Sequence, residues 1–317
     1  MVGAAPSNPE LVEKLKADIR KSGFPLEVHV LNVCSTKNTG RMPSLKYEYL
    51  DKVREIDLVA FYEAIDLEPP RGLIPQHTVT NLIIECKKSE SKPWVFFSSP
   101  AYGRDRVLHS LKYFSELDSY FAGRHLPPLL AQIYPAITKS HYVDASLRRC
   151  FSYCEAFKNT EKPSEIYTAI DSVIRYLSYR RRSRENRRKK SGVFSEFYLP
   201  IIVLEGCLFE ASISGAEIDL HQRSHLQLRT WQGEALDDLC VIDVVTRDHF
   251  QEFFNELEHF HDELVSAIRS LKFSAGFRAA ALASIKKPSL GFYSSGMVAM
   301  MMHDAKRRAR KTKKSRP

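Results

Sequence analysis

Two short segments hold the residue types with which this chain could carry out hydrolytic chemistry. The segment REIDLVA places Glu55 and Asp57 two positions apart, and the segment LIIECKKS places Glu85 and Lys87 two positions apart. Because successive side chains of a strand point to opposite faces, the two members of each pair would share a face. If the two strands pair as a hairpin, two carboxylates and an ammonium group converge at the end of an apolar sheet. Such a cluster is costly unless a cation and a polar substrate bind there.

The residue types in this cluster favour a divalent cation and a phosphate ester. Mg²⁺ prefers carboxylate oxygens and keeps several water ligands, so two acids and a substrate phosphate are sufficient. A bound Mg²⁺ would polarise the phosphate and lower the pKa of a coordinated water, which would attack phosphorus in line. Lys87 would position that water and offset the charge of the transition state. We therefore expect phosphodiester cleavage with Mg²⁺ as cofactor, for which Mn²⁺ can substitute.

Asp57 and the Glu85-Cys86-Lys87 motif resemble the Asp…Glu-x-Lys signature of the PD-(D/E)xK nucleases, especially Mrr-like restriction endonucleases and Holliday-junction resolvases. In that superfamily the Asp comes from the second core strand and the Glu-x-Lys ends the third. The resemblance implies that Asp57, Glu85 and Lys87 are catalytic. It also implies that Asp57, Glu85 and the backbone carbonyl of Cys86 bind the metal.

The resemblance implies one more acid, supplied by an N-terminal helix shortly before the Gly that ends it. Glu13 precedes Gly23 by ten positions and is the best match for this catalytic and metal-binding acid. Asp18 and Glu10 are weaker matches. An acid near the start of a helix also stabilises the helix dipole, so Glu13 has a structural alternative.

The acid-x-Lys pattern alone has low specificity, because it occurs at residues 85–87, 90–92 and 304–306. Only the first occurrence closes an apolar strand that follows an Asp-bearing strand. The alternative interpretation of this first occurrence is a salt bridge at the end of a strand, and Glu55 is interpreted as a solvated neighbour. The resemblance covers residues 9–97, and the spacing from Asp57 to Glu85 is long, which suggests an enlarged hairpin loop.

The positive charge of the chain is concentrated in two blocks. The formal net charge is +9, and residues 180–190 and 306–317 each hold eight basic side chains, so the rest of the chain is mildly acidic. Clustered Lys and Arg are expected of a protein that binds a phosphate backbone. We therefore expect nucleic acid, with DNA favoured, as the partner; the alternative is a solvated helix face and a disordered tail. The candidate contacts in the first block are Arg180, Arg181, Arg182, Arg184, Arg187, Arg188, Lys189 and Lys190.

The elements that must position these residues predict an α/β or α+β domain. We expect a restriction-endonuclease-like mixed central sheet flanked by helices, with a helical insertion and a basic C-terminal tail. The expected helices are 9–22, 104–121, 142–157, 165–182 and 248–271. The expected strands are 26–34, 46–50, 53–62, 78–87, 94–97, 198–211 and 239–246.

These elements divide the chain into four expected parts. Residues 1–100 form the N-terminal part of the nuclease core, and 101–192 form the helical insertion that ends in the first basic block. Residues 193–272 supply the remaining core strands and a helix. Residues 273–317 form a peripheral segment and a basic tail that we expect to be disordered.

Composition points to a cytoplasmic protein without a membrane partner. No apolar run is long enough to span a bilayer, and the first residues lack the layout of a secretory signal. A homodimer is expected if both strands of a duplex are cut, since each subunit would carry one such site. Two other functions stay open: a catalytically inactive nuclease-fold module that binds nucleic acid or protein, and a nuclease directed at RNA.

Other polar residues give weaker signals. His259, His261 and Asp262 are interpreted as a solvated helix face, because positions 259 and 261 do not face each other on a helix. Glu205 is interpreted as a paired structural carboxylate. Trp94 is interpreted as part of the core or of a lid rather than as a base-stacking residue.

Overall fold

The computed structural model describes residues 8–35, 39–66, 76–99, 111–122, 127–137, 149–157, 164–185, 194–231 and 239–271. Its strands are β1 Gly40–Tyr49, β2 Lys52–Asp66, β3 Gln76–Ser98, β4 Lys112–Ser115, β5 Arg149–Glu155, β6 Phe194–Ser214, β7 Glu217–Gln222, β8 His225–Trp231 and β9 Leu239–Thr246. Its helices are α1 Pro9–Lys21, α2 Phe24–Ser35, α3 Glu116–Ala122, α4 Leu129–Ile137, α5 Glu165–Glu185 and α6 Phe250–Arg269, with a 3-10 turn at Arg247–His249.

Strands β1, β2 and β3 form an antiparallel meander at one side of a mixed nine-stranded sheet. β1 and β2 are joined by a tight turn in which Leu50 and Asp51 have φ values of 50° and 59°. Two consecutive residues with positive φ are typical of the type I′ turn, whose twist matches that of the flanking strands. β6 then pairs with β3 in parallel, and β9 pairs with β6 in parallel.

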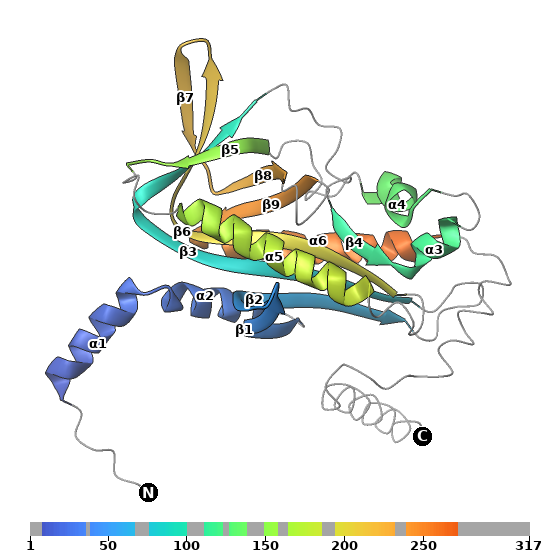
Figure 1. Ribbon diagram of the computed structural model, residues 1–317, viewed down its shortest axis with the longest axis horizontal. Coiled ribbons are helices and arrows are strands. Elements are labelled where there is room, and N and C mark those ends of the chain that lie inside the picture. The colour runs from blue at the N-terminus through green and yellow to red at the C-terminus, as the bar shows by residue number, and fades with distance from the viewer. Residues whose placement is uncertain are drawn as a thin grey trace, which may run out of the picture.

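The two longest strands take part in a closed circuit of pairings. β3 pairs with β5, β5 with β8, β8 with β9, β9 with β6, and β6 again with β3. This is possible because β3 and β6 extend for 23 and 21 residues, so each offers different parts of its length to different partners. The end of β6 and β7 project beyond this circuit as a hairpin (Figure 1).

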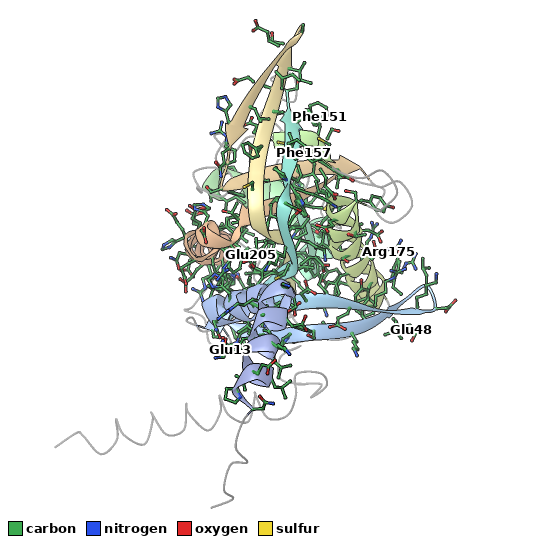
Figure 2. The ribbon with its side chains drawn as sticks, turned by 90° about the vertical axis from the view of Figure 1, so that its left-hand side faces the viewer. Glu13, Glu48, Phe151, Phe157, Arg175 and Glu205 are labelled. Atoms are coloured by element: carbon green, nitrogen blue, oxygen red, sulfur yellow. The ribbon has the colours of Figure 1, made fainter. Side chains whose placement is uncertain are left out.

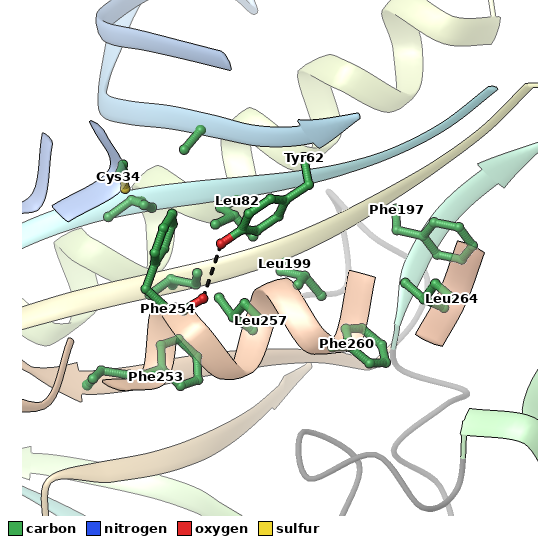
Figure 3. Packing of buried hydrophobic residues seen from close by; sticks show 14 of the residues in the cluster. Cys34, Tyr62, Leu82, Phe197, Leu199, Phe253, Phe254, Leu257, Phe260 and Leu264 are labelled. Carbon is green, nitrogen blue, oxygen red and sulfur yellow. Dashed lines mark hydrogen bonds between the residues drawn. The ribbon is translucent and has the colours of Figure 1, made fainter. Parts of the chain in front are cut away.

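Helices cover both faces of the sheet, α5 on one and α6 with α2 on the other (Figure 1). On the α6 face, Phe254 and Leu257 pack with Leu82 and Leu199 from the central strands (Figure 3). There the Tyr62 hydroxyl donates a hydrogen bond to the Phe254 carbonyl at 3.1 Å. Each fully buried apolar side chain of this size contributes about 2 kcal/mol relative to exposure, so the two layers hold the sheet rigidly.

The segment 26–34, expected as a strand, is helical, and this expectation was wrong. Leu26, Val30, Val33 and Cys34 are the buried residues of α2. Their spacing of four, three and one is that of a helix face, and the alternation of apolar and polar residues in the sequence concealed it. The correction matters because it changes which acid faces the neighbouring strands.

The segment 101–192 is not a purely helical insertion. The segment expected as a helix at 142–157 contains strand β5, and β4 occupies part of the segment expected as a helix at 104–121. Both strands join the main sheet, β4 beside β6 and β5 beside β3. The helix expected at 165–182 is confirmed as α5. The segment 273–317 lies outside the described residues.

Two other expectations concern buried polar and aromatic side chains. His261 was expected on a solvated face, and this was wrong: it is buried, and its Nδ1 lies 2.8 Å from the Thr80 hydroxyl. Trp94 is fully buried in the core, and Glu205 pairs with Arg247 at 2.9 Å, as expected. In the described part of the chain, no helix combines the length and the apolar character needed to cross a bilayer.

Candidate active site

The register of β2 and β3 brings Asp57 to the acid-Cys-Lys motif. Leu58 pairs with Ile84 in this antiparallel ladder, so Asp57 and Glu85 are the next residues on the two strands. Asp57 Oδ2 accepts a hydrogen bond from the backbone N–H of Cys86 at 2.7 Å. The expected hairpin register is therefore confirmed, and the Asp57 carboxylate is fixed by main chain rather than by a mobile partner.

Glu85 is a buried acid whose carboxylate pairs with Lys87. Lys87 Nζ donates to Glu85 Oε1 at 2.6 Å, and the Glu85 residue is 5% exposed. Its other oxygen, Oε2, is buried and has no hydrogen-bond partner in the part of the chain that the structure describes. Glu85 and Lys87 therefore form the salt bridge that was the alternative interpretation of this motif. The pair is not a solvated surface pair, because Glu85 is buried and its second oxygen lacks a partner among the described residues.

A third acid, Glu27 of α2, approaches the same place. It lines one cavity together with Asp57 and Lys87, and the charges of Asp57 and Glu55 act on it. Sequence reasoning missed Glu27 because its segment was taken for a strand. The one signal in the sequence was the four-residue spacing of Leu26, Val30 and Cys34, which is that of a helix face.

Glu13, by contrast, is not brought to this cluster. It lies on α1, a helix with no buried residue, and pairs with Lys16 at 2.7 Å while remaining exposed. Glu10 likewise pairs with Lys14 on the surface of the same helix. The acid from the N-terminal helices that lies near Asp57 is therefore Glu27 and not Glu13.

Beside the cluster lies a cavity of about 590 Å³, lined by residues of α2, of the interior of β2 and β3, and of the first turn of α5. Acids, hydroxyls and lysines line it, so it suits a charged and polar ligand. The lining residues are Lys21, Gly23, Glu27, Asp57, Cys86, Lys87, Lys88, Ser91, Glu165 and Thr168.

Burial and mutual repulsion make the three acids reluctant to ionise together. Burial, and to a lesser extent the charge of Asp57, raise the pKa of Glu85 to about 7, although Lys87 and Ser172 favour its charged form. Burial also raises the pKa of Asp57, against the opposing effects of the Cys86 N–H and Lys87. The pKa of Glu27 is raised by burial and then by Asp57. An added cation would relieve all three.

Lys87 is held in its charged form by the same cluster. Burial alone would lower its pKa, but the attraction of Glu85 outweighs burial and the pKa of Lys87 is raised. Its ammonium group is therefore a permanent positive charge beside Glu85. Such a group can donate hydrogen bonds to a phosphate oxygen or to water, and it cannot act as a base.

The donor set fits a divalent cation that keeps water ligands. Within the described ranges, no three His, Cys, Asp or Glu side chains already form a group able to hold a metal ion alone. The vacant Oε2 of Glu85 and the Asp57 carboxylate supply hard oxygen ligands, with Glu27 nearby. Mg²⁺ commonly binds through one or two carboxylates and completes its shell with water and substrate oxygens, so this set is sufficient.

The basic residues of the first block have different surroundings. Arg180 is mostly buried and pairs with the buried Glu196 at 2.5 Å, so its charge is used inside the protein. Arg181 and Arg182 are exposed, and the Arg182 guanidinium lies 5.0 Å from the centre of the Tyr49 ring. The Arg184 side chain and residues 187–190 lie outside the described part.

No family model, no curated protein and no solved structure matches this chain.

Proposed function

We propose that this chain is a divalent-metal-dependent nuclease that hydrolyses phosphodiester bonds, with DNA as the favoured substrate. The observation that carries the proposal is the meeting of Asp57, Glu85 and Lys87: Asp57 and Lys87 line one cavity, and Glu85 is bonded to Lys87 beside it. With Glu27, three acids of raised pKa surround Lys87, whose charge acts on each of them. Groups whose pKa values are shifted by burial and by each other are typical of functional sites.

The position of these residues in the fold supports assignment to the PD-(D/E)xK superfamily. Asp57 lies on the second strand of the meander and Glu85 and Lys87 on the third, as in that superfamily. A helix before the meander supplies Glu27, which takes the part first expected of Glu13. One difference is that β3 continues beyond Lys87 to Ser98 instead of ending at the motif.

Each residue has a role that its surroundings support. The Cys86 N–H holds the Asp57 carboxylate in place, so the orientation of this ligand is set before substrate binds. Asp57 and Glu85 would hold the cation, with Glu27 and the Cys86 carbonyl as further oxygen donors. When bound, a divalent cation neutralises phosphate charge and makes water a better nucleophile at neutral pH.

Lys87 completes the site with a charge that does not depend on pH in the physiological range. Because its pKa is raised, the Lys87 ammonium remains protonated while it donates to Glu85. From this position it would orient the attacking water and stabilise the negative charge that develops on the phosphate. Its partner Glu85 keeps the Nζ atom on the cavity side of the sheet.

A nuclease assay on DNA and RNA side by side tests the proposal. We expect cleavage with Mg²⁺ or Mn²⁺, none with EDTA, and loss of cleavage in Asp57→Asn and Lys87→Ala. Asp18→Asn, on the exposed helix α1, is the matched control for loss of one acid. Unchanged cleavage in both site variants would contradict the proposal. Salt-sensitive binding without cleavage in any divalent metal would favour the inactive module, and cleavage of RNA alone would favour the RNA nuclease.

A further inference from the structure

One face of α5 leads from the cavity to the first basic block. Thr168, Ser172, Arg175, Tyr179 and Arg182 follow one another at intervals of four, three, four and three, which places them on the same side of the helix. Thr168 lines the cavity, and Ser172 acts on the Glu85 carboxylate. The polar face therefore begins at the candidate site and ends where the basic block begins.

Strand β1 flanks this face at the edge of the sheet, where its one strand partner within the described ranges is β2. The Tyr47 ring lies 5.2 Å from the Tyr179 ring, and Arg182 lies over Tyr49. Figure 2 shows Arg175 on the side of the molecule toward which the β1–β2 hairpin, marked by Glu48, projects. Helix and hairpin together thus form one rim, on which Thr168 and Arg182 are exposed and Arg175 and Tyr179 are half-buried.

Not every polar group of this rim is open to a ligand. The Tyr47 hydroxyl and Arg54 Nε are buried and have no hydrogen-bond partner within the described residues. Arg175 is oriented by Asp171, which accepts from its Nε at 2.5 Å. This acid compensates part of the charge of Arg175, so we assign the larger share of the attraction for an anion to Arg182.

We propose that this rim, with Thr168, Arg175, Tyr179 and Arg182 as its contacts, is a track for the phosphate backbone of a nucleic acid engaged at the candidate site. The proposal depends on the proposed function. Arg, Thr and Tyr side chains and the N-terminus of a helix are the groups that bind phosphate and sugar in protein–nucleic acid complexes. An acidic peptide could bind the cations, but it would bring no phosphodiester to the cavity.

The length of the track sets a minimum length for the substrate. Fourteen residues separate Thr168 from Arg182, which corresponds to roughly 21 Å along a helix. One strand of duplex DNA carries a phosphate about every 3.4 Å along its axis, so the track spans about six of them. On one side of the cleaved bond, the nucleic acid must therefore extend for about six phosphates to contact every residue from Thr168 to Arg182.

Binding of labelled DNA in EDTA tests the track, because EDTA prevents cleavage during the measurement. Fluorescence anisotropy at increasing salt would be measured for the full chain with duplexes of about 20 and about 5 base pairs. In Arg175→Gln/Arg182→Gln we expect the slope of log affinity against log salt to fall by about two for the long duplex. The short duplex would change less. Arg175→Lys/Arg182→Lys retains both charges and should retain the slope, and Lys14→Gln on exposed α1 is the matched surface control.

An unchanged slope in the double Gln variant, or an equal loss in the double Lys variant, would overturn the track. Absence of DNA binding by the unsubstituted chain would overturn it as well. The two proposals fail separately: cleavage with an unchanged slope removes the track and leaves the nuclease. A reduced slope without cleavage in any metal leaves the track and removes the nuclease. Thermal unfolding of each variant shows whether its fold is intact.

Discussion

Asp57 Oδ2 lies 2.7 Å from the backbone nitrogen of Cys86, so the acid of β2 is bonded to the main chain at the centre of the Glu85-Cys86-Lys87 motif. This bond ties the two halves of the candidate site together across neighbouring strands. Leu58 and Ile84 are the last paired residues of β2 and β3 on this side, so the bond lies directly beyond their ladder. The positions of the acids therefore depend on the sheet itself.

The first prediction concerns Asp57→Asn. The amide keeps an oxygen that can accept the Cys86 N–H, so the fold should be retained. The negative charge is lost, and we expect cleavage to fall by about a hundredfold or more, since a preorganised charge at a reacting phosphate contributes on this scale. Single-turnover cleavage with Mg²⁺ measures the effect, and circular dichroism checks the fold. Cleavage within a factor of two of the unsubstituted chain would be inconsistent with a role for Asp57.

The second prediction separates Glu27 from Glu13. Glu27 lines the cavity beside Asp57, whereas Glu13 is exposed and pairs with Lys16. Glu27→Gln should lower the affinity of the site for Mg²⁺, so that a higher Mg²⁺ concentration is needed for half-maximal cleavage. Glu13→Gln should leave it unchanged. The reverse result would restore the expectation drawn from the sequence.

The third prediction follows from the pKa of Glu85. Burial raises it from 4.5 to about 7 in the folded chain, so the folded state binds more protons than the unfolded state between these values. Stability without metal should therefore fall as pH rises from about 4.5 to 7, by an amount on the order of 3 kcal/mol from this group. Glu85→Gln should remove this component. Thermal unfolding in EDTA measures it, and added Mg²⁺ should raise the midpoint of the unsubstituted chain at pH 8 but not that of Glu85→Gln.

The fourth prediction concerns His261, which acts in the opposite sense. Burial lowers its pKa from 6.5 to about 4, so the unfolded state binds the extra proton between these values. The neutral side chain bonded to Thr80 is stable above pH 6.5, and stability should decline as pH falls from 6.5 toward 4. His261→Gln should flatten this decline in urea titrations. A decline of equal steepness in the variant would assign it to other groups.

The fifth prediction concerns the backbone behind Lys87. A Cβ at Gly206 of β6 would lie 2.5 Å from the Ser89 carbonyl oxygen, two residues beyond Lys87. Gly206→Ala should shift β3, reduce cleavage and destabilise the fold by about 1–3 kcal/mol. Gly215→Ala is the matched control, because that glycine has φ of +64° but no atom within 4 Å of the added Cβ. Its cost should be backbone strain of about 1 kcal/mol, without loss of cleavage.

The site residues on strands could be predicted because they depend on short-range patterns. Alternation along β2 and β3 places Asp57, Glu85 and Lys87 correctly once the two strands pair, and the register confirms this. Glu27 could not be found in this way, because Leu26, Val28 and Val30 alternate like a strand while Leu26, Val30 and Cys34 repeat like a helix. Only packing against β2 and β3 decides between the two periods.

Charge in the sequence was a weaker guide than hydrophobic pattern. Arg180 begins the first basic block, but its position on α5 turns it toward Glu196 inside the protein. Arg182, two residues later, lies on the exposed side of the same helix. The basic residues of this helix are therefore divided between the interior and the surface. Sequence alone does not show which side of the helix packs against the sheet. The strand β5 was hidden for a related reason, since its pairing partners β3 and β8 are far from it in sequence.

Because β3 continues past the motif, Glu85, Cys86 and Lys87 lie in the interior of a strand and face Ile202, Val203 and Leu204 of β6. Amides of this segment that bond to β6 should exchange their hydrogens only when the pairing of β3 with β6 opens, not by fraying of a strand end. Heating should then displace Glu85 and Lys87 only when the pairing of β3 with β6 is lost. A protease acting on loops or on the projecting hairpin would leave the reactive groups in place.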